Sequence, residues 1–201
     1  IYKLGYWNSR NGSKSGVGSN LNSTENIRDE LTKFIKKKKI KTLFDIPCGD
    51  FFWMRKIDLK KINYTGGDIV TEVIKSNQKI YSKKNIKFCN KDLITETIEK
   101  YDVIFVRDCF VHLSDKEIIL SLRNICDSKS IYLISTFFKK NWNNSKSKKI
   151  DNWRPLNLMK TPFNLPKPDY VLNDNAPHNK YDKNKFMGVW KIKKIKNKLF
   201  K

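Results

Sequence analysis

Hydrophobic and polar residues follow two different patterns along the chain. Short apolar runs of strand length occur at residues 42–46, 64–70, 86–93, 101–108 and 130–138. The run at 101–108 is largely apolar, which is typical of a strand that is buried on both faces of a sheet. The segments between the runs repeat their apolar residues at helical spacing. This alternation predicts an α/β protein with a mostly parallel, doubly wound sheet.

The helical pattern is clearest at residues 22–39. Its apolar side chains fall on one face, namely Ile27, Leu31, Phe34 and Ile35. Ser23 or Thr24 is the expected cap, and the lysines at 36–39 complement the C-terminal end of the helix dipole. Further helices are expected at 52–57, 71–83 and 114–126, and further strands at 170–173 and 187–192.

Polar residues follow the predicted strands where each one ends. The strand at 42–46 stops at Pro47-Cys48-Gly49-Asp50, and the next strands end at Asp68, Asp92 and Arg107-Asp108. In open α/β sheets, ligands bind beyond the carboxyl ends of the strands. The sequence therefore predicts a ligand site at this edge of the sheet.

The turn at residues 47–50 joins a buried strand to an expected helix, as in the opening unit of a nucleotide-binding sheet. At such a turn the backbone comes close to a ligand, and the free N–H groups of the next helix face it. The dinucleotide fingerprint G-x-G-x-x-G is absent, so we do not expect a nicotinamide cofactor. The carboxylate of Asp45 suits a cationic or hydroxyl-rich ligand.

Two further acids have positions that suit a nucleoside. Asp68 lies 23 positions after Asp45, at the place where α/β folds bind the two hydroxyls of a ribose. A carboxylate fits this role because it accepts a hydrogen bond from each hydroxyl. The alternative is that Asp68 caps the helix at 71–83, and the two roles are compatible. Asp92 is positioned to accept from the exocyclic amine of a base.

Two polar segments leave alternatives open. Residues 15–19 form either a disordered leader or a lid whose glycine backbone and serine hydroxyls face an anion, and the aromatic pair Tyr6-Trp7 favours the ordered form. Residues 139–185 form either a surface loop or an ordered insertion that shapes a substrate pocket. Trp153 and Arg154 favour the ordered form.

The composition limits the fold and the compartment. A chain of 201 residues is sufficient for one domain with a full core. The four cysteines lack C-x-x-C spacing, so we expect reduced thiols in a cytoplasmic protein, with neither disulfides nor a metal site. The sequence contains no apolar run of membrane-spanning length and no signal-peptide pattern.

The net charge of +22 is compatible with nucleic-acid binding, but we do not favour that interpretation. Most of the positive charge is lysine, which is enriched together with asparagine and isoleucine, as codon bias in an AT-rich genome produces. A solvated lysine surface is therefore expected. An anionic substrate is also compatible with the charge.

The residues at the strand ends resemble a known family. Residues 45–50, Asp-Ile-Pro-Cys-Gly-Asp, are similar to motif I of class I S-adenosylmethionine-dependent methyltransferases, D-x-G-x-G-x-G. Asp68 is similar to the ribose-binding acid of that family, Asp92 to its adenine-edge acid, and residues 101–104 to its fourth-strand motif. The likeness covers nearly the whole chain, although Pro47 and Phe51 replace two motif I glycines.

The resemblance implies a Rossmann-like fold with a seven-stranded, mostly parallel sheet whose last strand is antiparallel. It implies a single methyltransferase domain over residues 1–201, with an N-terminal lid and helix at 1–41 and a substrate-side insertion at 139–186. It also implies S-adenosylmethionine as the cofactor. The residues expected to bind it are Trp7, Gly16, Gly18, Ser19, Asp45, Pro47, Cys48, Gly49, Asp50, Trp53, Asp68, Ile69, Asp92, Leu93, Arg107 and Asp108.

A narrower resemblance concerns the acceptor of the methyl group. The segments P-C-G-D-x-x-W-M, G-G-D-I-V, R-D-C-x-V-H-L-S, W-R-P-L-N-L and P-F-N-L-P-x-P together are similar to a branch associated with glycan and small-molecule methylation. The signatures N-P-P-Y and D-P-P-Y, found in enzymes that methylate exocyclic amines of bases, are absent. We therefore expect O-methylation of a sugar, a glycan or another small polar acceptor. A nucleic-acid or protein methyltransferase and a non-catalytic methyltransferase-like binding protein are the alternatives.

Methylation of an oxygen requires a general base beside the methyl group, and Asp108 and His112 are the candidates. An imidazole is able to take a hydroxyl proton near neutral pH. A packed structural histidine is the alternative for His112, and His178 is a weaker candidate for the base. The residues expected to contact the acceptor are Arg107, Trp153, Arg154 and Asn157. Ion pairing is the alternative for the two arginines.

Overall fold

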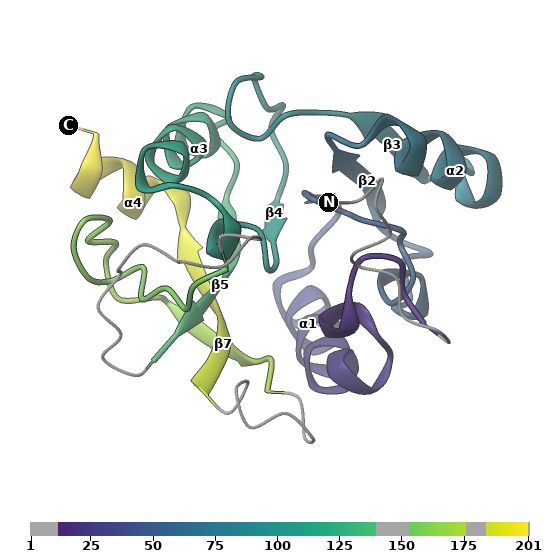
Figure 1. Ribbon diagram of the computed structural model, residues 1–201, viewed down its shortest axis with the longest axis horizontal. Helices are drawn as coiled ribbons and strands as arrows, with labels where there is room; N and C mark the ends of the chain where they lie inside the picture. The colour runs from purple at the N-terminus through teal and green to yellow at the C-terminus, as the bar shows by residue number, and fades with distance from the viewer. Residues whose placement is uncertain (1–11, 140–152, 176–183, 201) are drawn as a thin grey trace.

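A seven-stranded sheet runs through the part of the chain that the computed structural model describes, residues 12–139, 153–175 and 184–200 (Figure 1). The strands are β1 Thr42–Asp45, β2 Asn63–Asp68, β3 Ile86–Asn90, β4 Val103–Val106, β5 Tyr132–Phe138, β6 Tyr170–Asn173 and β7 Lys185–Lys191. Their order across the sheet is β3-β2-β1-β4-β5-β7-β6. β1 to β5 pair in parallel, and β7 is antiparallel to both of its neighbours. The doubly wound sheet with an antiparallel last strand is therefore confirmed.

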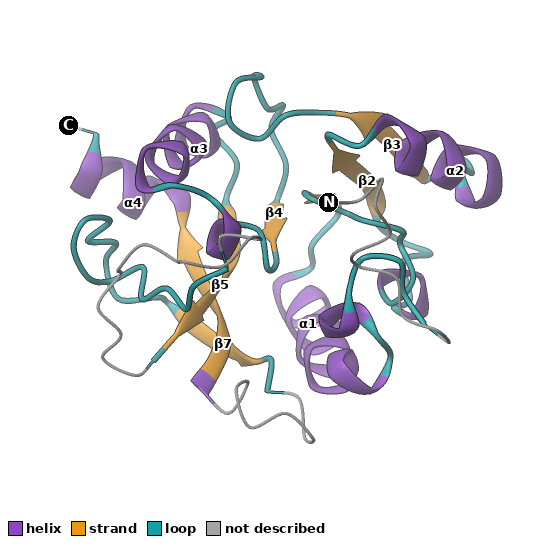
Figure 2. Cartoon of the chain, viewed as in Figure 1, coloured by secondary structure: helices purple, strands orange, loops and turns teal. Residues whose placement is uncertain are grey.

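Helices cover both faces of the sheet (Figure 2). They are α1 Glu25–Lys38, α2 Thr71–Tyr81, α3 Asp115–Asp127 and α4 Ile192–Leu199. α1 and α2 pack in a first core with the strand residues Leu43 and Phe105, whereas α3 and α4 pack in a second core with Phe44 and Ile104. Neighbouring strand residues thus point to opposite faces of the sheet, as the pleat requires.

α1 shows how the amphipathic pattern builds an element. The residues predicted to share a face are all buried in the first core: Ile27, Leu31, Phe34 and Ile35. The helix begins later than expected because Asn22–Thr24 forms a 3-10 turn. The Thr24 hydroxyl donates to the carbonyl oxygen of Asn20 at 2.9 Å and does not cap the helix. Lys39 ends the helix in the left-handed conformation, with φ at 52°.

The segment after β1 differs from the helix expected at 52–57, since it forms only the 3-10 turn Met54–Lys56. Phe51 is in the left-handed region at φ 57°, and its ring centroid lies 4.9 Å from that of Tyr64. Phe51, Trp53 and Met54 are all buried, so nearly consecutive side chains point inward. A helix with one buried face cannot satisfy that pattern. The described chain therefore has no helix N-terminus directly after β1.

The sequence reasoning missed α4. Ile192 and Ile195 are buried in the second core, and the helix packs against α3 (Figure 1). Apolar residues three positions apart in a lysine-rich octamer have the spacing of a helix, and this was the available signal. None of the helices in the described ranges is long and apolar enough to cross a membrane.

Candidate functional site

The turn after β1 is fastened to β2 at the carboxyl edge of the sheet. The backbone N–H of Cys48 donates to the carbonyl oxygen of Gly67 in β2 at 2.8 Å. Gly49 follows with a left-handed φ of 53°, and its N–H donates to the carboxylate of Asp68 at 3.1 Å. Pro47 is half-buried at the start of the turn. The turn and the end of β2 thus form one fixed corner.

The loop at residues 13–20 lies directly over this turn. The carboxylate of Asp50 accepts hydrogen bonds from the Ser13 hydroxyl at 2.9 Å and from the Lys14 N–H at 2.6 Å. The Asp50 N–H donates in return to the Ser15 hydroxyl at 3.0 Å. A Cβ at Gly49 would lie 2.3 Å from that hydroxyl, so glycine is required beneath the loop. Asp50 therefore holds the 13–20 loop against the turn.

Asp68 and Ile69 stand at the end of β2 beside the turn. Asp68 is 5% exposed, and its carboxylate accepts from the N–H groups of Gly49 and Val70 at 3.1 and 3.0 Å. Burial raises the pKa of Asp68, and these backbone donors act in the opposite direction. The next side chain, Ile69, is 67% exposed. The corner therefore combines a buried carboxylate with an uncovered apolar surface.

Asp92 follows β3, next to the end of β2. The Lys91 N–H donates to the carbonyl oxygen of Asp68 at 3.0 Å, which joins the two segments. The carboxylate of Asp92 accepts from the Ile94 N–H at 2.8 Å and from the Thr95 hydroxyl at 2.6 Å. The side chain of Leu93 is buried in the second core, so only its backbone is able to meet a ligand.

Asp45 does not reach the surface. It is buried beneath the turn, and it accepts a hydrogen bond from the Tyr64 hydroxyl at 2.7 Å. Desolvation raises the pKa of Asp45 to about 7, although the Tyr64 hydrogen bond acts to lower it. Cys48, also expected at the ligand, is buried beside it, and burial raises the pKa of its thiol. These two side chains support the turn from below.

The ends of β4, β6 and β7 meet in a cluster of buried charges. Arg107 donates to Asp174 from Nε and from Nη2, each at 3.0 Å. The Nζ atom of Lys185 lies 3.2 Å from Asp174 Oδ2 and 2.6 Å from Asp108 Oδ2. Asp174 is 1% exposed and Lys185 is 4% exposed. We call Arg107, Asp108, Asp174 and Lys185 the buried charge cluster.

Sequence reasoning missed two members of this cluster. Asp174 directly follows β6, as acids follow or end several other strands, and this position was its one available signal. Lys185 lies two positions before the strand expected at 187–192, among many other lysines, so nothing in the sequence distinguished it.

Arg107 is buried, and several of its contacts are internal. Its Nη1 atom donates to the carbonyl oxygen of Gly18 at 2.9 Å, and its guanidinium lies 5.4 Å from the ring centroid of Trp53. Trp53 itself is buried in the first core and does not close over the site as expected. A guanidinium in the interior needs a carboxylate partner, which Asp174 supplies. Arg107 thereby joins the 13–20 loop to the buried charge cluster.

Asp108 has the largest exposure in the cluster, with 29% of its side chain accessible. It is in the left-handed region at φ 52°, and its N–H donates to the Thr136 hydroxyl at 2.9 Å. Burial by itself raises the pKa of Asp108, but the charges of Lys185 and Arg107 outweigh burial and lower the pKa to about 2. A carboxylate with this pKa is a poor proton acceptor at neutral pH.

His112 lies in the 3-10 turn Phe110–His112 that follows Asp108. Its N–H donates to the carbonyl oxygen of Cys109 at 3.0 Å, and its imidazole acts electrostatically on Asp108. Burial raises the pKa of the Cys109 thiol to about 12, so this cysteine is not a thiolate near neutral pH. Of the two expected bases, His112 has the more suitable group.

The segment expected to contact the acceptor is largely committed to internal contacts. The Nη2 atom of Arg154 donates to Asp115 Oδ1 at 2.6 Å and to the carbonyl oxygen of Leu113 at 2.9 Å. Asn157 is buried, and its Oδ1 atom accepts from the Met159 N–H at 3.1 Å. Trp153 is half-buried, so it is the member of this set with the most surface for a ligand.

The structure brings most of the expected cofactor residues to one edge of the sheet. The 13–20 loop carries Gly16, Gly18 and Ser19, and a Cβ at Gly18 would lie 3.4 Å from Asp108 Oδ2. The loop therefore lies between the turn at 47–50 and the end of β4. Trp7 and His178 lie outside the described residues.

The sequence matches no protein-family model, and no curated protein matches it. Among solved structures, the methyltransferase domain of bacterial CtHen1-C superposes with a TM-score of 0.63 and 15% sequence identity, over 86% of this chain and 98% of that chain. The same domain of bacterial CtHen1-CN gives a TM-score of 0.59 and 14% identity, over 86% of this chain and 100% of that chain. At this identity the likeness concerns the fold, and the protein has the Rossmann-like fold of class I methyltransferases.

Proposed function

We propose that this protein is an S-adenosylmethionine-dependent methyltransferase that methylates an oxygen of a sugar, a glycan or another small polar acceptor. The observation that carries the proposal is the corner at the carboxyl edge, where the turn at 47–50, Asp68 and Asp92 adjoin one another. The fold, which is shared with a methyltransferase domain, supports the methyltransferase part of the proposal.

The residues at this corner fit an adenosyl group. Ile69 is a large aliphatic side chain with 67% of its surface uncovered, which suits the face of an adenine. Asp68 supplies the carboxylate for the ribose hydroxyls, and Asp92 lies on the adjoining segment for the adenine edge. When bound, S-adenosylmethionine supplies an electrophilic methyl group. In the proposal, Gly16, Gly18 and Ser19 cover the methionine side from the 13–20 loop.

The acceptor belongs beside the end of β4. Methyl transfer depends largely on positioning, because the attacking atom and the methyl carbon must be held in line. Asp108 and His112 follow β4, and the 13–20 loop adjoins Asp108 at Gly18. In the proposal, His112 takes the proton of the acceptor hydroxyl.

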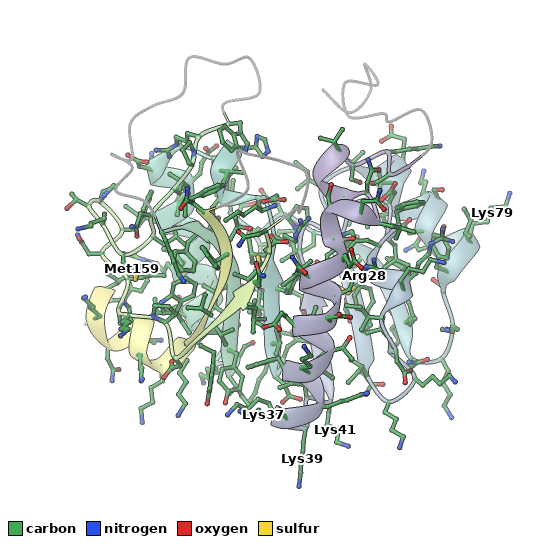
Figure 3. The ribbon with its side chains drawn as sticks, turned by 90° about the horizontal axis from the view of Figure 1, so that it is seen from below. Arg28, Lys37, Lys39, Lys41, Lys79 and Met159 are labelled. Atoms are coloured by element: carbon green, nitrogen blue, oxygen red, sulfur yellow. The ribbon has the colours of Figure 1, made fainter. Side chains whose placement is uncertain are left out.

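The distribution of lysines supports a small acceptor. Exposed lysines precede each of β1 to β5, at the edge of the sheet opposite the turn, and Lys37, Lys39 and Lys41 mark this end of the molecule in Figure 3. A nucleic-acid acceptor needs positive surface beside the site, since it is held by its phosphates. The exposed lysines that precede β1 to β5 lie at the edge away from the site.

Calorimetric titration of the purified protein with S-adenosylmethionine and S-adenosylhomocysteine tests the proposal. We expect both ligands to bind in the micromolar range. Asp68→Asn keeps an oxygen for the Val70 N–H but removes the charge, and it should weaken both ligands by at least about tenfold, the effect of losing a hydrogen bond to a charged group. Lys41→Gln, an exposed residue at the opposite edge, is the matched control and should bind with unchanged affinity.

The possible results test the proposed cofactor and the proposed acceptor independently. No binding of either ligand, by a protein with a native circular dichroism spectrum, would overturn the proposed function. Binding followed by methyl transfer to sugars or sugar nucleotides would establish it. Binding followed by transfer to RNA or protein, with no transfer to sugars, would replace the acceptor by one of the alternatives.

A further inference from the structure

The buried charge cluster presents one functional group outward. Exposed fractions of the side chains are 5% for Arg107 and Lys185 and 0% for Asp174, against 29% for Asp108. Removing ionic groups from water is unfavourable unless their partners compensate for it closely. Two cations and two carboxylates balance in this cluster, and Asp108 is the member that a ligand is able to touch.

Asp108 is also held in a strained backbone conformation. A left-handed φ of 52° is unfavourable at a residue other than glycine, and it persists only where the surroundings enforce it. The enforcing groups come from several elements: Lys185 on β7, Arg107 directly after β4 and Thr136 on β5, with His112 in the following turn and Asp174 behind the two cations. Strain of this kind is concentrated at ligand-binding positions.

The two carboxylate oxygens of Asp108 are used unequally. Oδ2 lies 2.6 Å from Lys185 Nζ and 3.3 Å from Arg107 Nη1. Oδ1 is approached, among the described residues, by the Thr136 hydroxyl at 3.3 Å, and the same hydroxyl lies 3.3 Å from Met187 Sδ. A carboxylate oxygen accepts about two hydrogen bonds. Oδ1 therefore has capacity for a further donor.

We infer that Asp108 is a fixed hydrogen-bond acceptor for the group that receives the methyl, and that Lys185 is the positioning residue that holds it there. The inference rests on the proposed function and says which kind of group on the acceptor receives the methyl. The methylated group must donate an O–H or an N–H hydrogen bond, as a sugar hydroxyl or an amine does. A carboxylate or phosphate oxygen has no such proton near neutral pH, and the charge of Asp108 repels it.

The transfer step then proceeds as follows. The lone pair of the acceptor oxygen or nitrogen forms a bond to the methyl carbon, and the carbon–sulfur bond breaks with its electron pair on sulfur. The proton that was hydrogen-bonded to Asp108 leaves to the imidazole of His112, because a carboxylate paired with two cations does not retain it. Asp108 orients the lone pair and stays ionised throughout.

A carboxyl NMR titration of protein with ¹³C-labelled aspartate tests the role of Lys185 without cofactor. Asp108→Asn identifies the resonance. We expect Asp108 to stay ionised from pH 8 down to pH 4, in keeping with a pKa of about 2. In Lys185→Gln the midpoint should rise by at least about one unit, because a neighbouring cation is lost, and Lys185→Arg should restore it. An Asp108 that titrates in the wild type above pH 4 would overturn the inference.

A second experiment tests the acceptor class directly. Glucuronic acid carries hydroxyls and a carboxylate in one molecule, and glucosamine carries hydroxyls and an amine. Each is incubated with the protein and S-adenosylmethionine labelled with ¹³C in the methyl group, and the carbon shift of the transferred methyl identifies its new partner. We expect a methyl ether or a methylamine. In Lys185→Gln, transfer at pH 8 should fall because Asp108 is no longer held in place, and Lys185→Arg should recover it.

A methyl ester of glucuronic acid would overturn this inference and leave the proposed methyltransferase function standing. Failure of the wild-type protein to bind S-adenosylmethionine would instead remove the proposed function. The carboxyl titration reports on Asp108 and Lys185 in either case, so the two failures are distinguishable.

Discussion

The two edges of the sheet differ in how their charged residues are held in the described part of the chain. At the carboxyl edge, β1 and β2 end in Asp45 and Asp68, and Asp92 and Asp108 follow β3 and β4 by two positions. At the amino edge, the exposed lysines that precede β1 to β5 within three positions are Lys41, Lys61, Lys84, Lys100 and Lys129. Among the described residues, none of these lysines forms an ion pair, whereas the acids at the other edge are buried or hydrogen-bonded.

Helix dipoles account for part of the lysine edge without a binding partner. A helix between two parallel strands ends at the amino edge, and its dipole favours cations there. The last turn of α1 holds Lys36, Lys37 and Lys38, and that of α2 holds Lys79. The acids at the carboxyl edge interact with one another and with the turn, which dipoles alone do not require. The candidate site therefore differs from the amino edge in that its charged residues contact other residues, and not in the number of charges.

The largest expected difference between the edges is in stability. Arg107→Met leaves the buried carboxylate of Asp174 without its bidentate partner, and breaking a buried ion pair in this way costs about 3–5 kcal/mol of unfolding free energy. Lys41→Met removes an exposed lysine at the amino edge and should change stability by less than about 0.5 kcal/mol. Denaturant unfolding of both variants measures the contrast. Equal small losses would mean that the two edges are energetically alike.

The next contrast is in pH dependence. The folded-state pKa of Asp45, about 7, lies above the ordinary value of 3.8 that applies to the unfolded chain. The folded protein therefore binds this proton more tightly, so its contribution to stability is complete below pH 4 and is lost as the pH rises through 7. In Asp45→Asn, the loss of unfolding free energy between pH 4 and pH 7 should be smaller than in the wild type by at least about 1 kcal/mol. One unit of pKa shift corresponds to about 1.4 kcal/mol.

The control for this measurement is Asp58→Asn, which changes an exposed acid near the amino edge. It should leave the pH dependence between pH 4 and pH 7 as in the wild type. Stability curves are recorded by urea unfolding at several pH values. The same decline in Asp45→Asn as in the wild type would contradict the raised pKa of Asp45.

Gly49 and Lys39 both have a left-handed backbone, and exchanging glycine for a larger residue, or the reverse, should change stability in opposite directions at the two positions. Gly49→Ala places a Cβ 2.3 Å from the Ser15 hydroxyl at φ 53°, so it should cost about 1–3 kcal/mol and release the 13–20 loop. Hydrogen exchange of the Ser13 and Ser15 amides, which should accelerate, reports the release. Unchanged exchange in Gly49→Ala would show that the loop does not depend on the turn.

At the amino edge, Lys39 is the left-handed residue that ends α1, with φ at 52°. Glycine is favoured at this helix position, so Lys39→Gly should raise the unfolding free energy by about 0.5–1 kcal/mol. Thermal unfolding compares it with Lys37→Gly, which puts glycine inside the helix and should destabilise by about 1 kcal/mol. A loss of stability in Lys39→Gly would mean that the lysine side chain contributes more than its backbone strain removes.

The fold could be predicted from the sequence because the strands are local apolar runs that end at polar residues. The same pattern was sufficient to place Asp68, Asp92 and Asp108 at one edge. It was not sufficient for Arg107, whose partner Asp174 lies 67 positions away, since an ion pair between distant segments leaves no local pattern. The aromatic residues after β1 were interpreted as a helix, but Phe51 and Trp53 are set by packing against the sheet.

Burial of Lys185 has a consequence for chemical labelling. Among the described lysines it is the buried one, at 4% exposure, while the lysines at the amino edge are open to solvent. An amine-reactive reagent modifies the open amino groups rapidly and reaches Lys185 only when β6 and β7 separate from the end of β4. The labelling rate of the Lys185 amine, measured by mass spectrometry, therefore reports how often that side of the sheet opens.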